Sequence, residues 1–522
     1  MQRIVDTTRR QRKRLRLTPS ITADVTERPR PEVSDARVVD ESPTTSAASS
    51  LRKDIDWIHR RHEPSRWPLL ENTPAVRLPK KRSHNAVDAN ALTGRIEARF
   101  ARITVIGQGY VGLPLAVEFA SAGFAVTGID TSRERVAALN GGRSPIPDVT
   151  DKTLKALRDK GHYGASSDFD ILHESDVVII CVPTPLGKNK DPDISFVMAA
   201  ANEVATRLHA GQLVILESTT YPGTTEELLL PLFSDNAGKA GEDFFLAFSP
   251  ERIDPANATF KVGDIPKVVG GITPECSRLA ALLYSQIVTK VMQVSSPKVA
   301  EMSKLYENVF RNVNIALANE LALMCRNLGV ETREVIDAAA TKPFGFMAFY
   351  PGPGVGGHCI GIDSAYLAWK MKMDGYDARF IHLAEEINQG MPACIVAMVA
   401  EALNQHSRSL SGANILALGA SYKRGVGDIR ESPALEVMEQ LLKKGAKISY
   451  ADPHVPEVTV GGDKLHAIKA DPAAVRGADC VVILTDHREF DYKDVVSGAR
   501  LVVDARNATW GIPAGKGEVI RL

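Results

Sequence analysis

From Arg102 onward, short runs of branched apolar residues alternate with stretches of helical periodicity. ITVIG is followed by a glycine-rich turn, by the helical stretch YVGLPLAVEFASAG and by a second run, FAVTGID, that ends in an acid. Strand, turn, helix and strand in about 30 residues is the pattern of a βαβ unit. VVIICVPTP and QLVILESTT repeat the pattern of a buried strand. We therefore predict an open parallel sheet, with helices on both faces, over residues 101–296.

A second alternating region follows a helical middle. Residues 297–329 form one long helical candidate, with Pro297 at its start and Gly329 at its end, as is typical of helix termini. Its later half is largely apolar, which fits a spine between domains or a dimer interface. Strand and helix patterns resume at NILALGASYK and continue to LVVDARN. The chain is thus predicted to be an α/β protein with two Rossmann-like, doubly wound domains (101–296 and 406–522), joined by a long central helix in a helical middle domain (297–405).

Charge sets the first 100 residues apart. They contain 21 Lys+Arg and 13 Asp+Glu, although the whole chain balances 63 against 63. Because they are rich in Ser, Thr, Pro and Arg and lack sustained periodicity, we predict a basic, disordered extension over residues 1–100, with at most a short helix near residues 51–61. Its RRQRKRLR run fits nucleic acid or an anionic surface, and the simpler interpretation is a solvated tail.

Composition excludes several classes of protein. The 522 residues are 44% hydrophobic and 24% charged, which excludes a collagen-like fibre and a coiled-coil rod. No run approaches about 18 apolar residues, and no apolar segment follows the basic start, so we expect neither a transmembrane helix nor a secretory signal. The six cysteines are scattered without a CxxC pair, which predicts free thiols in a cytoplasmic protein.

Three glycines, Gly107, Gly109 and Gly112, fit the G-x-G-x-x-G fingerprint between a strand and a helix. The first allows a tight turn, the second lets a pyrophosphate approach the backbone and the third lets helix and strand pack closely. Asp130 ends the next strand, where it can bond both ribose hydroxyls and repel a 2′-phosphate. The pattern predicts NAD binding, against the alternative of a glycine-rich turn without a ligand.

The segment GPGVGGHCIGID (352–363) places a thiol directly after a glycine-rich loop. Such a loop is typical where a ligand or a backbone passes close by. Cys359 is therefore placed to meet a substrate, and it becomes a thiolate if basic groups lie near. The alternative is a structural cysteine. His358 has no second ligand at metal spacing, so we expect no metal site.

Lys304 and Asn308 lie one turn apart in the long helix and share a face. A lysine and an amide on one face could stabilise a developing oxyanion, although a solvated face is equally compatible with the sequence.

Together, these motifs resemble the UDP-glucose/GDP-mannose dehydrogenase family of nucleotide-sugar 6-dehydrogenases. GQGYVGLPLA, VPTP, ESTTYPGTT, SPER, AEMSKLYEN, GGHCIGID and YKRGVGDIRESPALE occur in that order between about Arg102 and Arg506. In that family, C6 of the sugar is oxidised twice, from alcohol to carboxylate, with two NAD and one water. The resemblance implies NAD as the cofactor, a UDP-sugar as the substrate and a homodimer or higher homo-oligomer built on the long helix.

The resemblance also implies residue roles. Cys359 would attack the intermediate aldehyde and form a thiohemiacetal, which is then oxidised to a thioester. Lys304 and Asn308 would stabilise the oxyanion, and Asp363 would hold Lys304 and a water. Glu251 would act as the base in thioester hydrolysis, and Thr219 would help to place the water. The NAD contacts would be Gly107, Gly109, Gly112, Asp130, Arg135, Thr184 and Arg430. The UDP-sugar site would include Lys423, Gly354, Gly356 and Gly357.

The segment KPFGFMAFYPGPGVGGHC is similar to enzymes that act on UDP-N-acetylated hexosamines. This resemblance implies UDP-N-acetylglucosamine 6-dehydrogenase activity in surface polysaccharide biosynthesis, with UDP-N-acetylmannosamine and UDP-glucose as alternative substrates. Where relatives typically read HCIPIDP, this chain has Gly361 and Ser364, and Ala348 replaces another proline. Fewer restricted backbone positions predict a looser loop around Cys359.

Two other classes of protein compete with this interpretation. A two-electron alcohol dehydrogenase of the β-hydroxyacid type would need neither Cys359 nor the second α/β half. A non-catalytic scaffold with a nucleic-acid- or membrane-binding tail would not need to retain Cys359, Lys304, Asn308 and Asp363.

Overall fold

The computed structural model describes residues 89–187, 189–252, 262–513 and 515–522; the basic run and the helix expected near residues 51–61 lie outside these ranges. The described chain begins with α2 (Ala89–Glu97), a helix that lies within the last part of the predicted extension. Leu92 and Ile96, four positions apart, are buried in the same core as α8 (Pro274–Tyr284). One apolar pair at helical spacing docks this short helix, although it is too brief a signal to stand out in the sequence.

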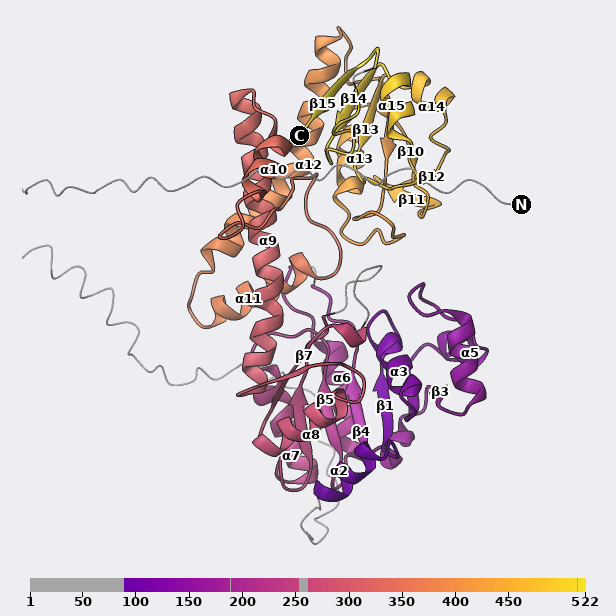
Figure 1. Cartoon of the computed structure of the whole chain (residues 1–522), viewed down its shortest axis with the longest axis vertical. Coiled ribbons are helices and arrows are strands. Elements are labelled where there is room, and N and C mark those ends of the chain that lie inside the picture. Colours follow the sequence, from indigo (N-terminus) through magenta and orange to yellow (C-terminus); the bar gives the residue numbers. More distant parts are fainter. Residues whose placement is uncertain (1–88, 188, 253–261, 514) are drawn as a thin grey trace, which may run out of the picture. The chain divides into compact units, whose positions relative to one another are not determined.

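The first α/β domain is built on an eight-stranded sheet with the spatial order β3-β2-β1-β4-β5-β6-β7-β8 (Figure 1). Its strands are β1 (Arg102–Ile106), β2 (Ala125–Ile129), β3 (Tyr163–Ser166), β4 (Val177–Ile180), β5 (Leu213–Leu216), β6 (Phe245–Phe248), β7 (Lys267–Gly271) and β8 (Val291–Val294). Neighbouring strands are parallel except β6 and β7, so the prediction of a fully parallel sheet is wrong at this pair. The described part of the β6–β7 connection holds only the short turn η4 (Val262–Asp264). Antiparallel neighbours need no crossover helix, whereas parallel neighbours do.

Helices cover both faces of this sheet, as predicted. Successive residues of β4 point to opposite sides, so that Val177 and Ile179 join one core while Val178 and Ile180 join the other. The first core includes α3 (Gly112–Ser121), α5 (Asp151–Asp159) and α8, and the second includes α6 (Ser195–Arg207) and α7 (Leu230–Ala237). The remaining helical segments are α4 (Arg133–Asn140), η2 (Phe169–Glu174) and η3 (Thr225–Leu229).

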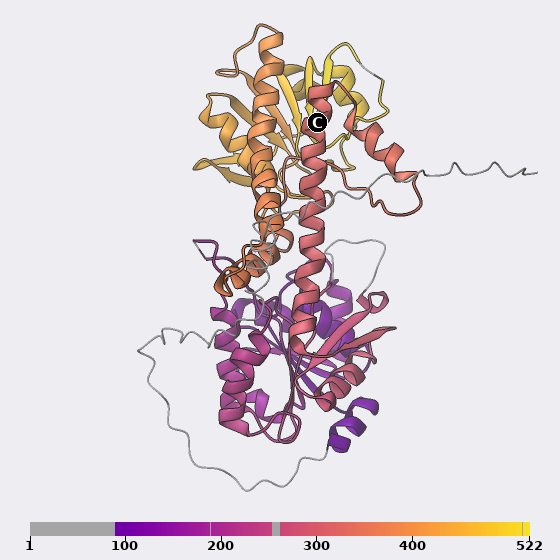
Figure 2. The same cartoon turned by 90° about the vertical axis from the view of Figure 1, so that its left-hand side faces the viewer.

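The predicted long helix is α9 (Pro297–Leu328), and it is uninterrupted (Figure 2). The Ser296 hydroxyl accepts a hydrogen bond from the Val299 amide at its start, and Gly329 ends it in the left-handed conformation at φ 67°. The middle domain also contains α10 (Thr332–Ala340), α11 (Ile360–Met373) and α12 (Arg379–Gln405). Within the described ranges, no helix is long and apolar enough to cross a bilayer.

The second α/β domain contains a five-stranded, wholly parallel sheet with the order β10-β9-β13-β14-β15. These strands are β9 (Asn414–Leu418), β10 (Lys447–Ala451), β13 (Cys480–Ile483), β14 (Leu501–Asp504) and β15 (Glu518–Arg521). Helices α12 and α13 (Pro433–Lys443) pack on one face, and α14 (Pro472–Gly477) and α15 (Tyr492–Gly498) pack on the other. A separate antiparallel pair, β11 (Glu457–Val460) and β12 (Asp463–His466), was not predicted; its chain turns at Gly461 and Gly462. A Gly-Gly step between alternating segments is a hairpin signal.

The six cysteines are free thiols. Four of them are buried, whereas Cys394 and Cys359 are only partly buried.

Candidate active site

The glycine fingerprint has the predicted geometry. Gly107 has φ 94°, and a Cβ on it would lie 2.3 Å from the carbonyl oxygen of Cys181. A Cβ on Gly112 would lie 1.9 Å from the carbonyl oxygen of Gly107, whereas a Cβ on Gly109 would have no neighbour within 4 Å. No described side chain caps the N-terminus of α3, where Val111 is the N-cap residue. The two outer glycines thus serve packing, and the middle one faces open space beside free backbone N–H groups that favour an anion.

Asp130 follows β2 and is 7% exposed. Its Oδ2 accepts a hydrogen bond from the backbone N–H of Gln108 at 3.1 Å and pairs with Arg135 at 2.9 Å, and its Oδ1 accepts from Ser132 at 2.9 Å. Asp130 and Arg135, which were predicted as separate cofactor contacts, form an ion pair. The carboxylate is thus held beside the glycine turn, where it could meet a ribose.

Arg430 is more than 300 residues from the glycine turn in sequence and reaches it in space. Its guanidinium lies 5.3 Å from the ring centroid of Tyr110, and it makes a bidentate pair with Asp428. Thr184, after β4, is half-buried, and the carbonyl of the next residue, Pro185, accepts a hydrogen bond from the Tyr366 hydroxyl in α11 at 3.1 Å. Arg430 therefore lies beside the glycine fingerprint.

The thiol, the lysine and the carboxylate of the predicted catalytic set come together at the start of α11. Cys359 is the N-cap residue of that helix. The Asn308 amide donates to Oδ2 of Asp363, and Nζ of Lys304 lies 3.9 Å from the same oxygen. Lys304 and Asn308 are 8% and 7% exposed, so the alternative of a solvated face is wrong.

Burial and charge act against each other in this cluster. Burial raises the pKa of Cys359 to about 11, although Lys304 opposes the shift. Burial also raises the pKa of Asp363 to about 6, again against the attraction of Lys304. Burial by itself disfavours the Lys304 charge, yet Asp363 and Cys359 outweigh it and the pKa of Lys304 is raised. The lysine therefore stays cationic beside a thiol that holds its proton at neutral pH.

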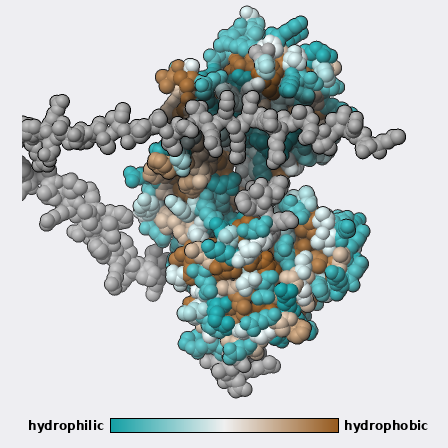
Figure 3. Space-filling model, in the orientation of Figure 1, coloured by the Kyte–Doolittle hydropathy of each residue, from teal (hydrophilic) through white to brown (hydrophobic). Residues whose placement is uncertain are grey.

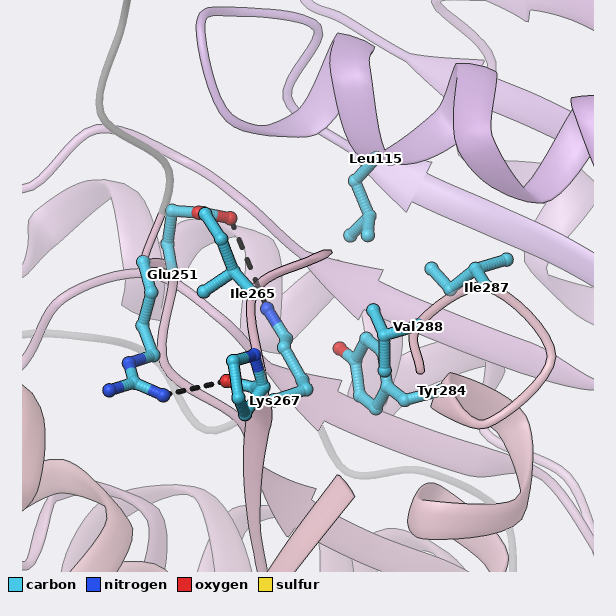
Figure 4. Close-up of a pocket in the computed structure, with 9 residues that line it drawn as sticks. Leu115, Glu251, Ile265, Lys267, Tyr284, Ile287 and Val288 are labelled. Carbon is cyan, nitrogen blue, oxygen red and sulfur yellow. Dashed lines mark hydrogen bonds and ion pairs between the residues drawn. The ribbon is translucent and has the colours of Figure 1, made fainter. Parts of the chain in front are cut away.

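Glu251 lies in a second buried cluster (Figure 4). Its Oε2 is 3.9 Å from Nζ of Lys267, which also pairs with Glu217 and lies 5.0 Å from the centroid of the Tyr284 ring. The Tyr284 hydroxyl donates to Glu217 at 2.6 Å. Burial raises the pKa of Glu217 to about 7, although Lys267 opposes the shift. Glu251 and Lys304 interact electrostatically, which links this cluster to the one at Cys359.

Thr219 is half-buried in the segment after β5. The neighbouring Ser218 accepts a hydrogen bond from the Val182 amide at 2.8 Å and donates to its carbonyl at 2.9 Å. The segments that carry Thr184 and Thr219 therefore lie side by side at the carboxyl ends of β4 and β5, where ligands of open α/β sheets bind.

The glycine loop before Cys359 packs closely against the second α/β domain. A Cβ on Gly356 would lie 2.6 Å from the Glu431 carbonyl oxygen, and one on Gly357 would lie 2.8 Å from the ring of Tyr422. Gly354 has φ 135°, and a Cβ on it would lie 3.1 Å from the Asn388 carbonyl oxygen. Of the two explanations for such a loop, a passing backbone is therefore observed at Gly354 and Gly356, whereas an aromatic side chain lies against Gly357.

Lys423 follows β9 in a loop that is fixed by a buried aspartate and histidine, which the sequence analysis missed. Asp452 accepts from the Ala420 amide at 2.8 Å and pairs with Nε2 of His487 at 3.0 Å. His487 also contacts the Ser421 hydroxyl and accepts at Nδ1 from the Gly425 amide. Asp452 follows the end of β10, and His487 follows the end of β13. This position after a strand end is the signal that could have identified both residues.

His487 also lies within ligand distance of His454 and Glu489, a combination that could hold a metal ion. Both ring nitrogens of His487 are already hydrogen-bonded, so the observed role of this group is to support the loop.

A chain of buried amides supports the Cys359 loop from the other side. Asn312 donates to the Ser364 hydroxyl at 3.2 Å and accepts from Asn388 at 2.8 Å. Asn319 donates to Asn388 at 2.8 Å and accepts from the Gly352 amide at 2.9 Å. Ser364, expected to loosen the loop, is thus bonded to α9, and through Asn312 it is connected to α12; both Ser364 and Gly361 lie inside α11. No spacing rule in the sequence identifies this network.

Three known protein domains match successive parts of the chain, in the order of its structural domains. Residues 101–288, 298–390 and 416–510 match the NAD binding, central and UDP binding domains of the UDP-glucose/GDP-mannose dehydrogenase family. The chain belongs to this family. It is an NAD-dependent nucleotide-sugar dehydrogenase, as the ordered motifs predict, and NAD and a UDP-sugar are its ligands.

The match to individual relatives extends over nearly the whole length of each relative. The chain is 36% identical to UDP-N-acetyl-D-glucosamine 6-dehydrogenase of Pseudomonas aeruginosa over 74% of this chain and 91% of the relative. It is 37% identical to UDP-N-acetyl-D-mannosamine dehydrogenase of Pyrococcus horikoshii over 79% and 97%. The solved UDP-D-ManNAc dehydrogenase of Pyrococcus horikoshii superposes with a TM-score of 0.73 at 35% identity, covering 80% of this chain and 98% of that one.

Proposed function

We propose that this enzyme oxidises C6 of a UDP-N-acetylhexosamine twice, from the primary alcohol to the carboxylate. Its preferred sugar in this proposal is UDP-N-acetylglucosamine. The observation that carries the proposal is the position of Cys359 beside Lys304, Asn308 and Asp363. A two-electron alcohol dehydrogenase has no use for a thiol at this place. A thiol that can hold an aldehyde covalently is what a second oxidation at the same carbon requires.

The residues at the glycine turn fit NAD, which supplies the hydride acceptor for both oxidations when it is bound. The open side of Gly109 and the free N–H groups of α3 would bind the pyrophosphate. Asp130, held by Arg135 and two backbone amides, would bind the ribose hydroxyls and repel a 2′-phosphate. Thr184 and Arg430 would close the site from the sides of β4 and of the second α/β domain.

Cys359 adds to the C6 aldehyde after the first oxidation. The sulfur–carbon bond forms as the carbonyl π pair moves onto oxygen, where the Lys304 ammonium and the Asn308 amide stabilise the negative charge. Oxidation of this thiohemiacetal leaves a thioester on Cys359. The covalent bond keeps the aldehyde from escaping between the two oxidations.

Hydrolysis then releases the acid. Glu251 takes a proton from a water that Thr219 helps to place, the water oxygen bonds to the carbonyl carbon, and the carbon–sulfur bond breaks with the electron pair going to sulfur. Nζ of Lys267 lies 3.9 Å from Oε2 of this carboxylate.

The choice of sugar rests on resemblance. The segment before Cys359 is similar to enzymes for UDP-N-acetylated hexosamines, and the two relatives above, at 36% and 37% identity, carry names with N-acetylated sugars. UDP-N-acetylmannosamine and UDP-glucose are the alternatives. Lys423 and the loop around Gly354, Gly356 and Gly357 would contribute to the UDP-sugar site. The product would be used in surface polysaccharide biosynthesis.

A substrate panel tests this proposal. The purified full chain is given NAD and each of the three UDP-sugars, kcat/KM is measured from NADH formation, and the product is identified by mass spectrometry. We expect the uronate of UDP-N-acetylglucosamine and the highest kcat/KM for this sugar. Preference for another of the three corrects the sugar only. No turnover with any of them would favour the scaffold alternative.

A homodimer through α9 is the expected assembly. Tyr306, Leu317 and Leu328 on this helix are 63%, 60% and 76% exposed, and apolar residues gather at its C-terminal end (Figure 3). Burying such side chains against a second copy would stabilise a dimer. Sedimentation equilibrium tests it, and a monomer at micromolar concentration would contradict it. The free cysteines fit a cytoplasmic location, which we include in the proposal.

A further inference from the structure

His358 makes a contact that the predicted mechanism does not use. Its Nδ1 lies 2.8 Å from Sγ of Cys359, and both side chains are only partly buried. A nucleophile in hydrogen-bond contact with a possible base is the arrangement of activated thiols. Among the sequence-based predictions, His358 entered only as a metal ligand that lacks a second ligand.

The thiol needs a proton acceptor when it attacks. Because burial raises the pKa of Cys359, the sulfur carries its proton in the resting enzyme at neutral pH. Lys304 is a cation and cannot accept this proton, and the Oδ2 atom of Asp363 is engaged by Asn308 and Lys304. The imidazole is the hydrogen-bond partner that the described structure gives to the sulfur.

We propose that His358 is a catalytic residue, the general base that removes the thiol proton as Cys359 attacks the C6 aldehyde. The inference rests on the proposed four-electron reaction. The S–H bond breaks with its electron pair staying on sulfur, and the proton moves to Nδ1. Sulfur bonds to C6, and the π pair of the carbonyl goes to oxygen beside Lys304 and Asn308. The imidazolium returns its proton to sulfur when the thioester is hydrolysed.

The surroundings of His358 keep the imidazole neutral and therefore basic. Burial lowers its pKa from 6.5, and the charges of Arg430 before α13 and Lys304 in α9 lower it further, while Asp428 opposes them. A base with a lowered pKa is protonated, and so loses its function, only at acid pH. His358 can therefore accept the Cys359 proton throughout the neutral pH range.

The experiment separates the two oxidations. His358→Asn keeps a polar atom near the Nδ1 position but cannot take up a proton, and His466→Asn, at an exposed site, is the matched control. Enzyme is mixed with NAD and the best UDP-sugar of the panel, and NADH is followed in a stopped-flow instrument from pH 6 to pH 10. Semicarbazide traps any aldehyde that is released. Without cofactor, the rate of Cys359 alkylation by iodoacetamide is measured over the same pH range.

We expect His358→Asn to keep the first phase of NADH formation and to slow the second about 100-fold at pH 7, with aldehyde captured by semicarbazide. The second phase and the alkylation rate should both recover toward the wild-type values as the pH rises to 10, because about a tenth of a thiol with a pKa of about 11 is then ionised without a base. A merely structural role would not give this recovery.

Two results would overturn the inference alone. One is a His358→Asn enzyme whose second phase equals that of the wild type at pH 7. The other is a variant that loses both phases at every pH while the wild type shows both. A wild-type enzyme that forms a single NADH per sugar overturns the inference together with the proposed function.

Discussion

The side-chain amide of Asn308 donates a hydrogen bond to Oδ2 of Asp363, and this bond joins α9 to the first turn of α11 next to Cys359. Lys304 lies 3.9 Å from the same oxygen. One carboxylate oxygen thus orients both groups that are assigned to the oxyanion.

Replacing this carboxylate separates its charge from its hydrogen bond. Asp363→Asn can still accept from Asn308, but it leaves Lys304 without its buried counter-charge. We expect kcat to fall about 100-fold or more, and the alkaline limb of the pH–rate profile to move to lower pH because Asp363 raises the pKa of Lys304. Asp363→Ala should in addition lower the free energy of unfolding by about 3 kcal/mol. A rate and an alkaline limb equal to the wild type in Asp363→Asn would contradict the assignment.

The glycine fingerprint offers a matched pair of substitutions. Gly109→Ala adds a methyl group to open space, so we expect unchanged melting temperature and a Kd for NAD that rises about tenfold or more. Gly112→Ala drives a Cβ into the Gly107 carbonyl, so it should destabilise the domain instead. Calorimetric titration and thermal melting distinguish the two effects. Tight NAD binding by Gly109→Ala would show that the pyrophosphate does not pass there.

Glu251→Gln should stop the cycle at the thioester. Without a base for the water, the enzyme is expected to form about two NADH per active site in a burst and then to turn over at least 100-fold more slowly. Intact mass spectrometry of the quenched protein should find the sugar attached, and Cys359→Ser should remove the thioester. Full steady-state turnover in Glu251→Gln would assign hydrolysis to another group.

Glu217 predicts a pH dependence of stability. Its pKa is raised by burial from 4.5 to about 7, so the folded protein binds this proton more tightly than the unfolded chain. Its contribution is fully present below about pH 4.5 and is lost as the pH rises through about 7, with a total of about 3 kcal/mol. In Glu217→Gln, urea unfolding should show a correspondingly flatter pH dependence than the wild type over this range. Glu174→Gln, at an exposed site, should not change it; equal slopes in all three proteins would contradict the prediction.

Much of this architecture was predictable because its signals are local. The βαβ unit, the glycine turn and the ends of α9 each depend on residues within a few positions of one another. The antiparallel β6–β7 pair and the docking of α2 depend on partners distant in sequence, and short windows do not reveal them.

The catalytic residues divide in the same way. Lys304 and Asn308 share a helix face by spacing alone, but only their burial against α11 distinguishes a site from a solvated stripe. Ser364 was expected to loosen the Cys359 loop, and its bond to Asn312 instead ties α11 to α9. Such side-chain networks depend on tertiary packing, which the sequence pattern does not encode directly.

The stoichiometry of cofactor reduction tests the central claim most directly. A limiting amount of UDP-N-acetylglucosamine, or of the preferred sugar of the panel, is consumed to completion by the wild-type enzyme and by Cys359→Ala, and NADH is measured per sugar. The account predicts about two NADH per sugar with wild type, and at most one with Cys359→Ala. One NADH per sugar with the wild-type enzyme, or two with Cys359→Ala, would contradict the thioester mechanism.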